Sequence, residues 1–547
     1  MCLSMRLRKG GRKGGREGGR DVPRGPAVFR TYLLSYFTFS HSPPFPSPSC
    51  SLFLLPRRGQ RLTGLLGITE QMKEVSVTTE EFLDITIVQP DGTVKRVKAP
   101  ADPSQQTAYW LPRRALLSFL SSQIDKEECG KAITFHFGVS IEKLVMPRTQ
   151  GEVEAPGATA RVQAQLGDGT KVVFVSQKVL GCDGMNSRIR GGLAEWAAAA
   201  AAAAATAAVE KKSSKESQTP RFGLHFIDSP SAGLRYKILT LLDDFPLLAS
   251  HSHNITQKET CYSYVGLPTG GYFSPLPPLR LGLLPFKMKN IPRTANIITK
   301  PNAPIFSLTT GTEVLAFLKK ELPQCDIDRM ISEEEAQRFA LSPGGYFPRP
   351  QYCLEAQVVL GGGGEGGREG GKEGGGVVLM GDAIHAFPPD LGAGVNIALL
   401  DVLDFIFALD RGEGDWSQAL PLYESLRAPQ SRAVCELIPI GFPQQYNHML
   451  PAQKSIKLLG VGMRVALSKC FPWLLAPPVF FMCQDVKLDY SQVWEKAKRT
   501  TRILKGVGLV VVGAVVWKVM GGKGGREGGR VVEEGVRWVA AWMGKAR

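Results

Sequence analysis

The sequence predicts an α/β fold with an inserted β-rich domain and a helical C-terminal region. Two aliphatic runs, at residues 178–181 and 377–380, each end in a turn that pairs aspartate with glycine. Buried strands of a parallel sheet are aliphatic in this way, and they end in such a turn at the carboxyl edge of the sheet. Between the two runs, residues 221–351 mix short β-like stretches with prolines, which predicts a second domain. Residues 436–520 are mostly helical in pattern, and residues 521–547 form a tail.

Length and composition limit the number of domains and show which segments cannot form a core. The 547 residues suffice for two or three domains. Three glycine tracts, KGGRKGGREGGR at 9–20, residues 361–376 and GGKGGREGGR at 521–530, cannot bury apolar surface, so we predict that they are disordered. Their near-identity at three places indicates a repeated DNA element or a translated intron.

Charge and cysteine content exclude several classes of function. Much of the excess charge behind the net +16 lies in the glycine tracts and the first sixty residues, and no stretch interleaves basic with aromatic residues. We therefore expect no nucleic-acid partner. The 10 cysteines form no CxxC pair, so neither a zinc site nor a disulfide framework is predicted. Reduced thiols are typical of an intracellular protein.

Residues 1–56 are predicted to be a disordered leader unrelated to the rest. They combine a basic glycine tract with an aromatic, serine- and proline-rich stretch that lacks acidic residues after Asp21. Two interpretations remain open: an organelle-targeting leader and mispredicted upstream sequence. The first domain then covers residues 57–210 and 377–435, with the tract at 361–376 as an insert just ahead of its second part.

Local patterns predict the elements of the first domain in order. Leucines at helical spacing indicate a helix over residues 62–72, and a hairpin follows around Pro90 and Gly92. A helix begins after Pro112. A second hairpin pairs residues 161–166 with 171–176, and the alanine tract at 197–208 is predicted to be a surface insertion.

The C-terminal region contains an apolar segment at 506–517 between Lys505 and Lys518. A membrane-spanning helix needs about 20 apolar residues, more than this segment offers. An interfacial anchor or a buried helix is favoured, and membrane association through residues 503–520 is therefore an expectation.

The strongest chemical signal is the segment from Gly381 and Asp382 to the loop at 388–394, which enters a long helix pattern. Glycines there let backbone N–H groups at the helix N-terminus approach an anion or a polar ring edge. The plain alternative is a strand, a turn and a helix with Asp382 as a cap. A second signal, Asp183 and Gly184 followed by Ser187 and two arginines, has a β-turn with helix-capping residues as its plain alternative.

Together these segments resemble the FAD-dependent aromatic hydroxylases. GCDGMNSRIR is similar to the Asp-Gly motif of that family, and MGDAIHAFPPDLGAGVNIALLD to its Gly-Asp motif. Arg113, with Leu116 and Leu120, is similar to a third landmark, an arginine that heads a helix; Arg114 is an alternative one place out of step. RTANIITKPNAPIFSL and GGYFPRPQYC are similar to kynurenine 3-monooxygenase-like members.

The resemblance implies a Rossmann-like, three-layer FAD/NAD(P)-binding domain and a substrate domain at 221–351. In such a protein, Asp382 contacts the ribityl chain, the backbone of Pro389 and Gly392–Gly394 lines the flavin ring, and Asp183 serves the FAD and NADPH pyrophosphates with Arg188 or Arg190. The implied cofactor-binding residues are Arg113, Asp183, Gly184, Arg188, Gly381, Asp382, Pro389, Gly392, Gly394, Val395 and Asn396. No catalytic acid–base pair and no metal ligand is implied.

The implied function is hydroxylation of an aromatic or apolar ring compound with NADPH and O2 through a flavin hydroperoxide. Two alternatives stay open. One is an FAD-dependent isoprenoid reductase or epoxidase. The other is a non-catalytic remnant or a faulty gene model.

Several departures from the family pattern bear on this expectation. No strand–GxGxxG–helix unit precedes Arg57, so the usual pyrophosphate site is predicted to be absent and the FAD-binding domain incomplete. Ala393 stands where relatives often have glutamine, and Leu400 where they often have an acid. The run DITIVQ lacks the arginine that kynurenine enzymes use for the substrate carboxylate, and Tyr109 is displaced relative to Arg113. Kynurenine is therefore not the expected substrate.

Overall fold

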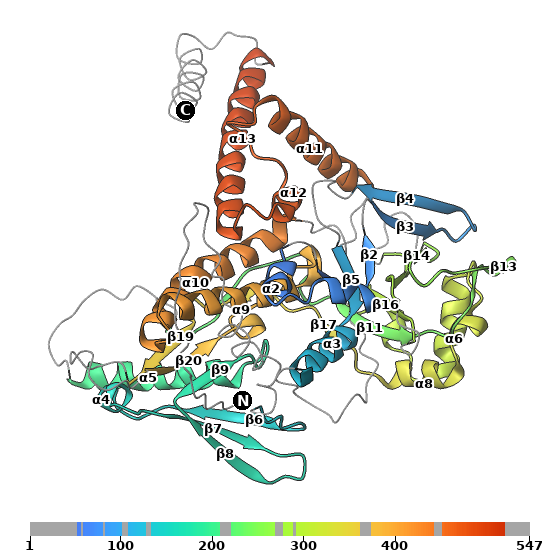
Figure 1. The fold of residues 1–547 in the computed structure, drawn as a ribbon. Coiled ribbons are helices and arrows are strands. Elements are labelled where there is room, and N and C mark those ends of the chain that lie inside the picture. Colours follow the sequence, from blue (N-terminus) through green and yellow to red (C-terminus); the bar gives the residue numbers. More distant parts are fainter. Residues whose placement is uncertain are drawn as a thin grey trace.

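The computed structural model describes residues 52–55, 58–79, 82–100, 108–126, 133–207, 220–268, 277–287, 292–361, 374–441 and 451–519. Helices and sheets are mixed throughout this part of the chain, and parallel strands occur in it, so the predicted α/β class is confirmed (Figure 1). The first and third glycine tracts and most of the second lie outside the described residues, and their predicted disorder stays a prediction.

A small sheet organises the first domain. Its order is β19 (Gln357–Leu360), β20 (Gly375–Leu379) and β9 (Lys178–Gly181). Strand β20 pairs with β9 in parallel and with β19 antiparallel. The two aliphatic runs that the sequence singled out are thus neighbouring strands, and they end at the same edge. The insert predicted at 361–376 is shorter than expected, because Gly375 and Gly376 belong to β20.

Helices and a second sheet cover the two faces of this small sheet. Figure 1 shows α9 (Gly394–Arg411) and α10 (Trp416–Gly441) on one side. On the other side lie α5 (Arg188–Ala207) and the antiparallel meander β6 (Ser140–Val145), β7 (Ala160–Gln165) and β8 (Lys171–Ser176). One core cluster takes buried side chains from all these layers, including Leu144, Ile189, Val378, Phe405 and Tyr423. The hairpin predicted at 161–176 is confirmed.

The alanine tract is not a separate insertion up to Ala207. It continues α5, with Ala197 still in the core. Alanine has the highest helix propensity, so the tract extends the helix it follows.

The second domain is built on a seven-stranded sheet that takes in more of the chain than the predicted 221–351. Its order is β17 (Gly345–Tyr346), β11 (Arg235–Thr240), β16 (Thr294–Thr299), β15 (Arg280–Leu283), β14 (Cys261–Val265), β3 (Phe82–Val88) and β4 (Val94–Pro100). The hairpin predicted around Pro90 is confirmed as β3–β4. It joins this sheet because β3 pairs with β14 in parallel.

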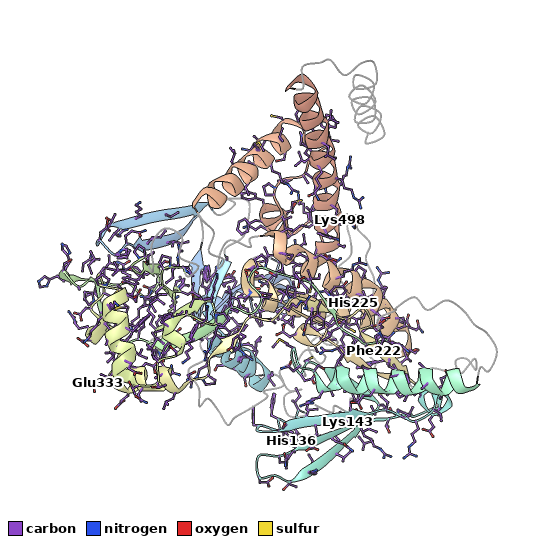
Figure 2. All side chains as sticks on the ribbon, turned by 180° about the vertical axis from the view of Figure 1, so that it is seen from behind. His136, Lys143, Phe222, His225, Glu333 and Lys498 are labelled. Atoms are coloured by element: carbon purple, nitrogen blue, oxygen red, sulfur yellow. The ribbon has the colours of Figure 1, made fainter. Side chains whose placement is uncertain are left out.

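Helices close the outer face of the seven-stranded sheet. They are α6 (Gly311–Glu321), which carries a capping box at Thr310, α7 (Ile327–Met330) and α8 (Glu333–Leu341). In Figure 2, Glu333 at the start of α8 lies far across the molecule from Lys498 on the C-terminal helix. The remaining short elements are α4 (Gln150–Glu154), β10 (His225–Phe226), β12 (Pro246–Leu248), β13 (His251–Ile255), η4 (Pro304–Phe306), β18 (Gln351–Tyr352) and β21 (His385–Ala386).

The N-terminal boundary differs from the prediction. Residues Leu52–Leu55, placed in the leader, form β1, which pairs with β5 (Ala108–Pro112); β5 also pairs with β2 (Val77–Thr79). Leu55 is fully buried in the core. The helix predicted over 62–72 is divided into α2 (Gln60–Leu65) and η2 (Glu70–Glu74), with Gly67 at positive φ between them. The helix after Pro112 is α3 (Arg113–Lys126).

The C-terminal region is helical, as predicted, although α10 crosses the expected boundary at 435/436. Beyond it lie α11 (Pro451–Cys470), α12 (Val479–Gln484) and α13 (Tyr490–Val519). Figure 1 shows α11 and α13 projecting together from the body. Among the described residues, no helix is long and apolar enough to cross a membrane.

Candidate functional site

The two predicted motifs form one site. Because β9 and β20 are parallel neighbours, the turn at Asp183 and the turn at Asp382 lie at the same sheet edge. The backbone N–H of Met380 donates to the carbonyl oxygen of Gly181 (3.0 Å). The guanidinium of Arg190 then joins the turns, since Nη1 donates to the carbonyl of Ala383 (2.5 Å) and Nη2 to that of Met185 (3.1 Å). Both terminal nitrogens of the Arg190 guanidinium are thus used in hydrogen bonds that connect the two motifs.

Asp183 caps helix α5. Its Oδ1 accepts from the Ser187 hydroxyl (2.6 Å), and its Oδ2 accepts from the backbone N–H groups of Arg188 (2.6 Å) and Ile189 (3.1 Å). These bonds satisfy donors that a helix start leaves open. In the structure this motif is therefore a turn with helix-capping residues, which was the alternative to a cofactor-binding motif. Gly184 (φ 83°) and the exposed Arg188 complete the turn, and the cofactor contacts expected of the three residues remain predictions.

A buried carboxylate outside the predicted set supports the Gly-Asp turn. Asp401 on α9 accepts from the backbone N–H of Gly381 (2.7 Å) and pairs with His385 Nε2 (2.8 Å). It also forms an ion pair with Arg427 on α10 (2.5 Å), which reaches Asp404 as well (2.9 Å). Burial would raise the pKa of Asp401, but Arg427, His385 and the Gly381 N–H outweigh burial and hold that pKa below its ordinary value.

Asp382 itself is exposed to solvent. Partial desolvation nevertheless raises its pKa, while the charges of His385 and Arg113 act in the opposite direction and Asp401 in the same one. The charge of Arg113, at the start of α3, is thus felt at Asp382, whereas Arg114 is not among the influences on this carboxyl group. The contact of Arg113 with the cofactor stays a prediction.

The start of α9 has no side-chain cap. The loop runs through η6 (Pro389–Leu391) to Gly392, whose φ of 58° favours glycine, and Ala393 at the N-cap provides no side-chain cap. A Cβ at Gly392 or Gly394 would meet nothing within 4 Å, so the backbone is approachable there. Val395 lies half-buried in the first turn, and the Asn396 side chain donates to the Gly392 carbonyl (3.0 Å). The N-terminus of this 18-residue helix carries partial positive charge.

Two residues ahead of α2 belong to the site but were not predicted. Gly59 packs directly on Asn396, since a Cβ there would lie 2.0 Å from Asn396 Oδ1. The Arg58 guanidinium donates to the carbonyls of Asp485 (2.5 Å) and Leu488 (2.7 Å) and lies over the Tyr490 ring. Arg58 thus anchors the segment to the C-terminal helices. Arg58 and Gly59 belong to no recognisable sequence motif, so their part in the site is visible only from their contacts in the structure.

A family profile described as "FAD binding domain" matches residues 372–437. This segment holds β20, the Gly-Asp turn, the loop at 388–394, α9 and Arg427. This match, together with the kynurenine 3-monooxygenase relatives, supports the resemblance to the FAD-dependent aromatic hydroxylases.

Curated relatives match over short stretches. Violacein synthase from Chromobacterium violaceum is 44% identical over 61 residues, 11% of this chain and 14% of that protein. Kynurenine 3-monooxygenase from Salinispora tropica is 31% identical over 143 residues, 25% of this chain and 29% of that protein. The enzyme of the same name from Caenorhabditis elegans is 28% identical over 133 residues, 24% and 28% of the two chains. The chain thus spans less than a third of the length of these relatives.

Solved structures with a similar course of the chain include pqsL, a probable FAD-dependent monooxygenase from Pseudomonas aeruginosa. It is 16% identical, with a TM-score of 0.40, over 76% of this chain and 90% of that one. Tetracycline destructase Tet(51) is 15% identical, with a TM-score of 0.43, over 80% and 93%.

The site fits one half of an FAD molecule. Asp382 and Arg113 offer a carboxylate and a guanidinium, and the N-terminus of α9 offers the positive end of a helix dipole. These groups suit a ribityl chain and the polar edge of a flavin ring. For the pyrophosphate, the described residues contain no GxGxxG segment between a strand and a helix. Within the described part of the chain, β9 pairs with β20 alone, so its other edge carries no strand.

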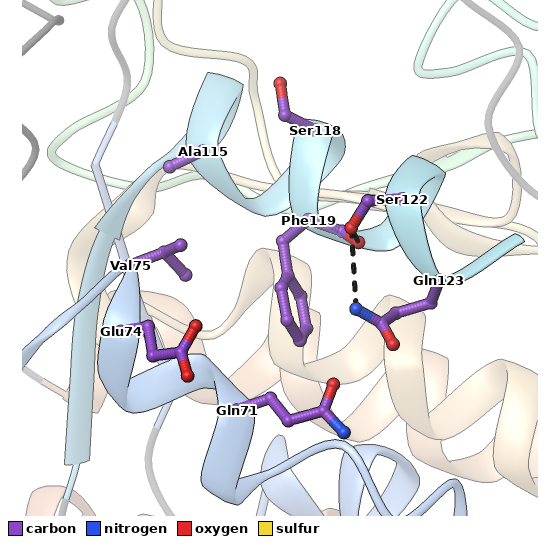
Figure 3. Close-up of a pocket in the computed structure, with 8 residues that line it drawn as sticks. All are labelled: Gln71, Glu74, Val75, Ala115, Ser118, Phe119, Ser122 and Gln123. Atoms are coloured by element: carbon purple, nitrogen blue, oxygen red, sulfur yellow. Dashed lines mark hydrogen bonds between the residues drawn. The ribbon is translucent and has the colours of Figure 1, made fainter. Parts of the chain in front are cut away.

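A cavity of about 360 Å³ lies between α3 and the segment 71–75 (Figure 3). Helix α3 contributes Ala115, Ser118, Phe119, Ser122 and Gln123, and η2 faces them with Gln71, Glu74 and Val75. None of the predicted cofactor-binding residues lines it, so we do not assign it to the flavin site.

Proposed function

We propose that the protein is an FAD-dependent monooxygenase that uses NADPH and O2 to hydroxylate an aromatic or apolar ring compound. The observation that carries this proposal is the uncapped N-terminus of α9 beside Asp382 and Arg113, within the segment that matches an FAD-binding domain. The name of the kynurenine 3-monooxygenase relatives supports a ring compound as the substrate class.

In this proposal each residue of the site has a binding or positioning role. The Asp382 carboxylate accepts from ribityl hydroxyl groups, and the N–H groups at the start of α9 donate to the polar edge of the flavin. Arg113 balances the negative charge of the Asp382 carboxylate. Asp401 and Arg427 hold the Gly381 backbone, so the direction of Asp382 is fixed before the cofactor binds.

Bound FAD would accept a hydride from NADPH and activate O2. In this proposal the chain need supply no acid–base pair for that chemistry. Its contribution is orientation and exclusion of water. The loop at 388–394 contacts Ser231 of the substrate domain, and this contact supports a flavin ring next to that domain.

The first test is cofactor retention by the purified full-length chain. We expect a yellow protein with flavin absorbance that is released on denaturation, and binding of added FAD with quenched fluorescence. NADPH oxidation and O2 uptake are then measured with a panel of aromatic compounds, against Asp382→Ala as the matched variant. A chain that folds cooperatively but binds no FAD would reject the proposal in favour of a remnant. NADPH oxidation that depends on lipid and not on aromatics would favour the isoprenoid enzyme.

We also propose that the end of the molecule formed by α11 and α13 associates with membranes. Leu459 on α11 and Leu509 on α13 are 67% and 74% exposed, and α13 carries the basic residues Lys496, Lys498, Arg499, Arg502 and Lys505. Apolar and basic side chains on projecting helices suit an anionic lipid surface. Cosedimentation with vesicles that contain anionic lipid tests this; equal recovery with neutral vesicles, or none, contradicts it.

A further inference from the structure

A second carboxyl group of the flavin loop is buried, and no cofactor role has been assigned to it. Asp390 lies in η6, between Pro389 and Gly392, and is 2% exposed. Its Oδ1 accepts from the hydroxyl of Ser231 (2.6 Å), a fully buried residue of the substrate domain. Its Oδ2 is buried and has no hydrogen-bond partner.

This hydrogen bond crosses between the two domains. Ser231 lies 159 positions away, in the turn that leads into β11, and the backbone N–H of Gly233 in that turn donates to Phe347 (3.0 Å). On the other side, Leu391 packs against Gly441 at the end of α10. The loop that is proposed to line the flavin is therefore held from the substrate domain through the Asp390 side chain.

The surroundings of Asp390 favour its uncharged form. An ionised carboxylate has about four acceptor positions, and here a single donor serves them. Burial raises its pKa to about 6, and the Ser231 hydroxyl, which lowers it, is the sole opposing influence in the described part of the chain. Neither Arg432 and Glu436 on the adjacent α10 nor the exposed pair Asp228–Arg349 (2.7 Å) beside the Ser231 turn contributes.

We infer that Asp390 is a positioning residue that, as a neutral carboxyl group, fixes the flavin loop against the substrate domain through Ser231. The link itself exists without FAD, while its effect on the flavin rests on the proposed function. Ionisation strengthens the Ser231 hydrogen bond but leaves a buried charge whose single donor does not offset its desolvation, so the buried position of the loop against the substrate domain becomes less stable. The contact between the loop and the substrate domain thus depends on one proton.

The test compares wild type with Asp390→Asn, which keeps an oxygen acceptor but cannot ionise. Because the folded pKa is raised, the folded chain holds a proton that the unfolded chain releases, so the stability of the wild type falls as the pH rises from 3.8 to about 6. In that window we expect the ratio of the two unfolding constants to change by up to about tenfold per pH unit, in favour of Asp390→Asn. Asp410→Asn, at an exposed position on α9, is the matched control and should show no such trend.

A gap between wild type and Asp390→Asn that does not change with pH would overturn the inference. Ser231→Ala supplies a second check: loss of its hydrogen bond should move the pH window upward, since that bond lowers the pKa. A double-mutant cycle of Ser231→Ala with Asp390→Ala should be non-additive if the two side chains are coupled. Additive effects would disprove the link.

The flavin readout separates this inference from the proposed function. If the chain binds FAD, the absorbance of the bound flavin should change with pH around 6 in the wild type and not in Asp390→Asn. Absence of FAD binding with an intact pH trend in stability rejects the proposed function and leaves the link standing. FAD binding with a pH-independent spectrum and stability rejects the link.

Discussion

Asp401 holds the Gly-Asp turn from inside the core, so its replacement affects both stability and cofactor binding. We predict that Asp401→Asn lowers the free energy of unfolding by roughly 3 kcal/mol at pH 7, because Arg427 keeps a buried charge with a weaker partner. Urea unfolding measures this. Asp410→Asn on the same helix serves as control, with an expected change within about 0.5 kcal/mol.

The pH dependence of this pair has a definite sign. A carboxyl group whose folded pKa is lowered stabilises the protein above its ordinary pKa of 3.8, and that contribution is lost as the pH falls through the folded value. Asp401→Asn should therefore lose less stability than wild type on acidification below pH 3.8. Parallel acid curves for the two proteins would contradict the proposed ion pair.

Gly59 gives a prediction of local geometry. Gly59→Ala places a methyl group on Asn396 Oδ1, so Asn396 must move away from the Gly392 carbonyl. We expect a loss of about 1–3 kcal/mol in unfolding free energy and weaker FAD binding. Gly64→Ala is the matched control on the same short helix, where the nearest atom lies 3.9 Å from the new methyl group. It should be neutral or stabilising, by up to about 1 kcal/mol.

At the scale of elements, the Asp183 cap governs the start of α5. Asp183→Ala removes the acceptor for the Ser187 hydroxyl and for two backbone N–H groups, so we predict a loss of about 1–2 kcal/mol in unfolding free energy. Asp183→Asn should retain about half of it. If FAD binding falls in both variants by more than the stability change explains, Asp183 also contacts the cofactor, as the family resemblance implies.

Elements that depend on near neighbours could be predicted from the sequence. The hairpins β3–β4 and β7–β8, the capped helix α6 and the strand–turn–helix around Asp382 follow from local turns and periodicity. The parallel pairing of β3 with β14 could not, because its register joins Ile85 to Cys261 across a long stretch of chain. The helical character of this region was expected, but not that α10 runs without a break through Pro421, Pro429 and Pro439. Burial against the core outweighs the cost of the prolines there.

The same distinction applies to the site. Asp382 and Asp183 each end a strand within a short motif, so their positions could be predicted. Asp401 and Arg427 look like ordinary polar residues on helices, and their partners are visible only after α9 and α10 pack together. Arg58 and Gly59 lie just after residues 1–56, which were interpreted as a leader, so their part in the site was not predicted. Leu55 lies within that segment, and its burial was not predicted for the same reason.

At the scale of the whole molecule, β19 and β20 pair in register up to Leu360 and Gly375, so the tract between them enters and leaves at the end of a hairpin. We predict that deletion of residues 362–373 leaves the thermal midpoint and FAD binding nearly unchanged. The entropy of closing a loop grows only by about 0.6 kcal/mol per doubling of its length. A large fall in the midpoint would show that the tract contributes to the fold. Deletion of β20 itself is the destabilising control.

The position of this tract also bears on how the chain tolerates additions to its gene. The paired strands β19 and β20 fix both ends of the tract. Their register is therefore the same whether the connection between them has two residues or fourteen. A connection at this point can therefore differ in length without moving the strands that carry the Gly-Asp turn. A residue added within β20 or the first turn of α9 would instead displace the residues of the proposed site.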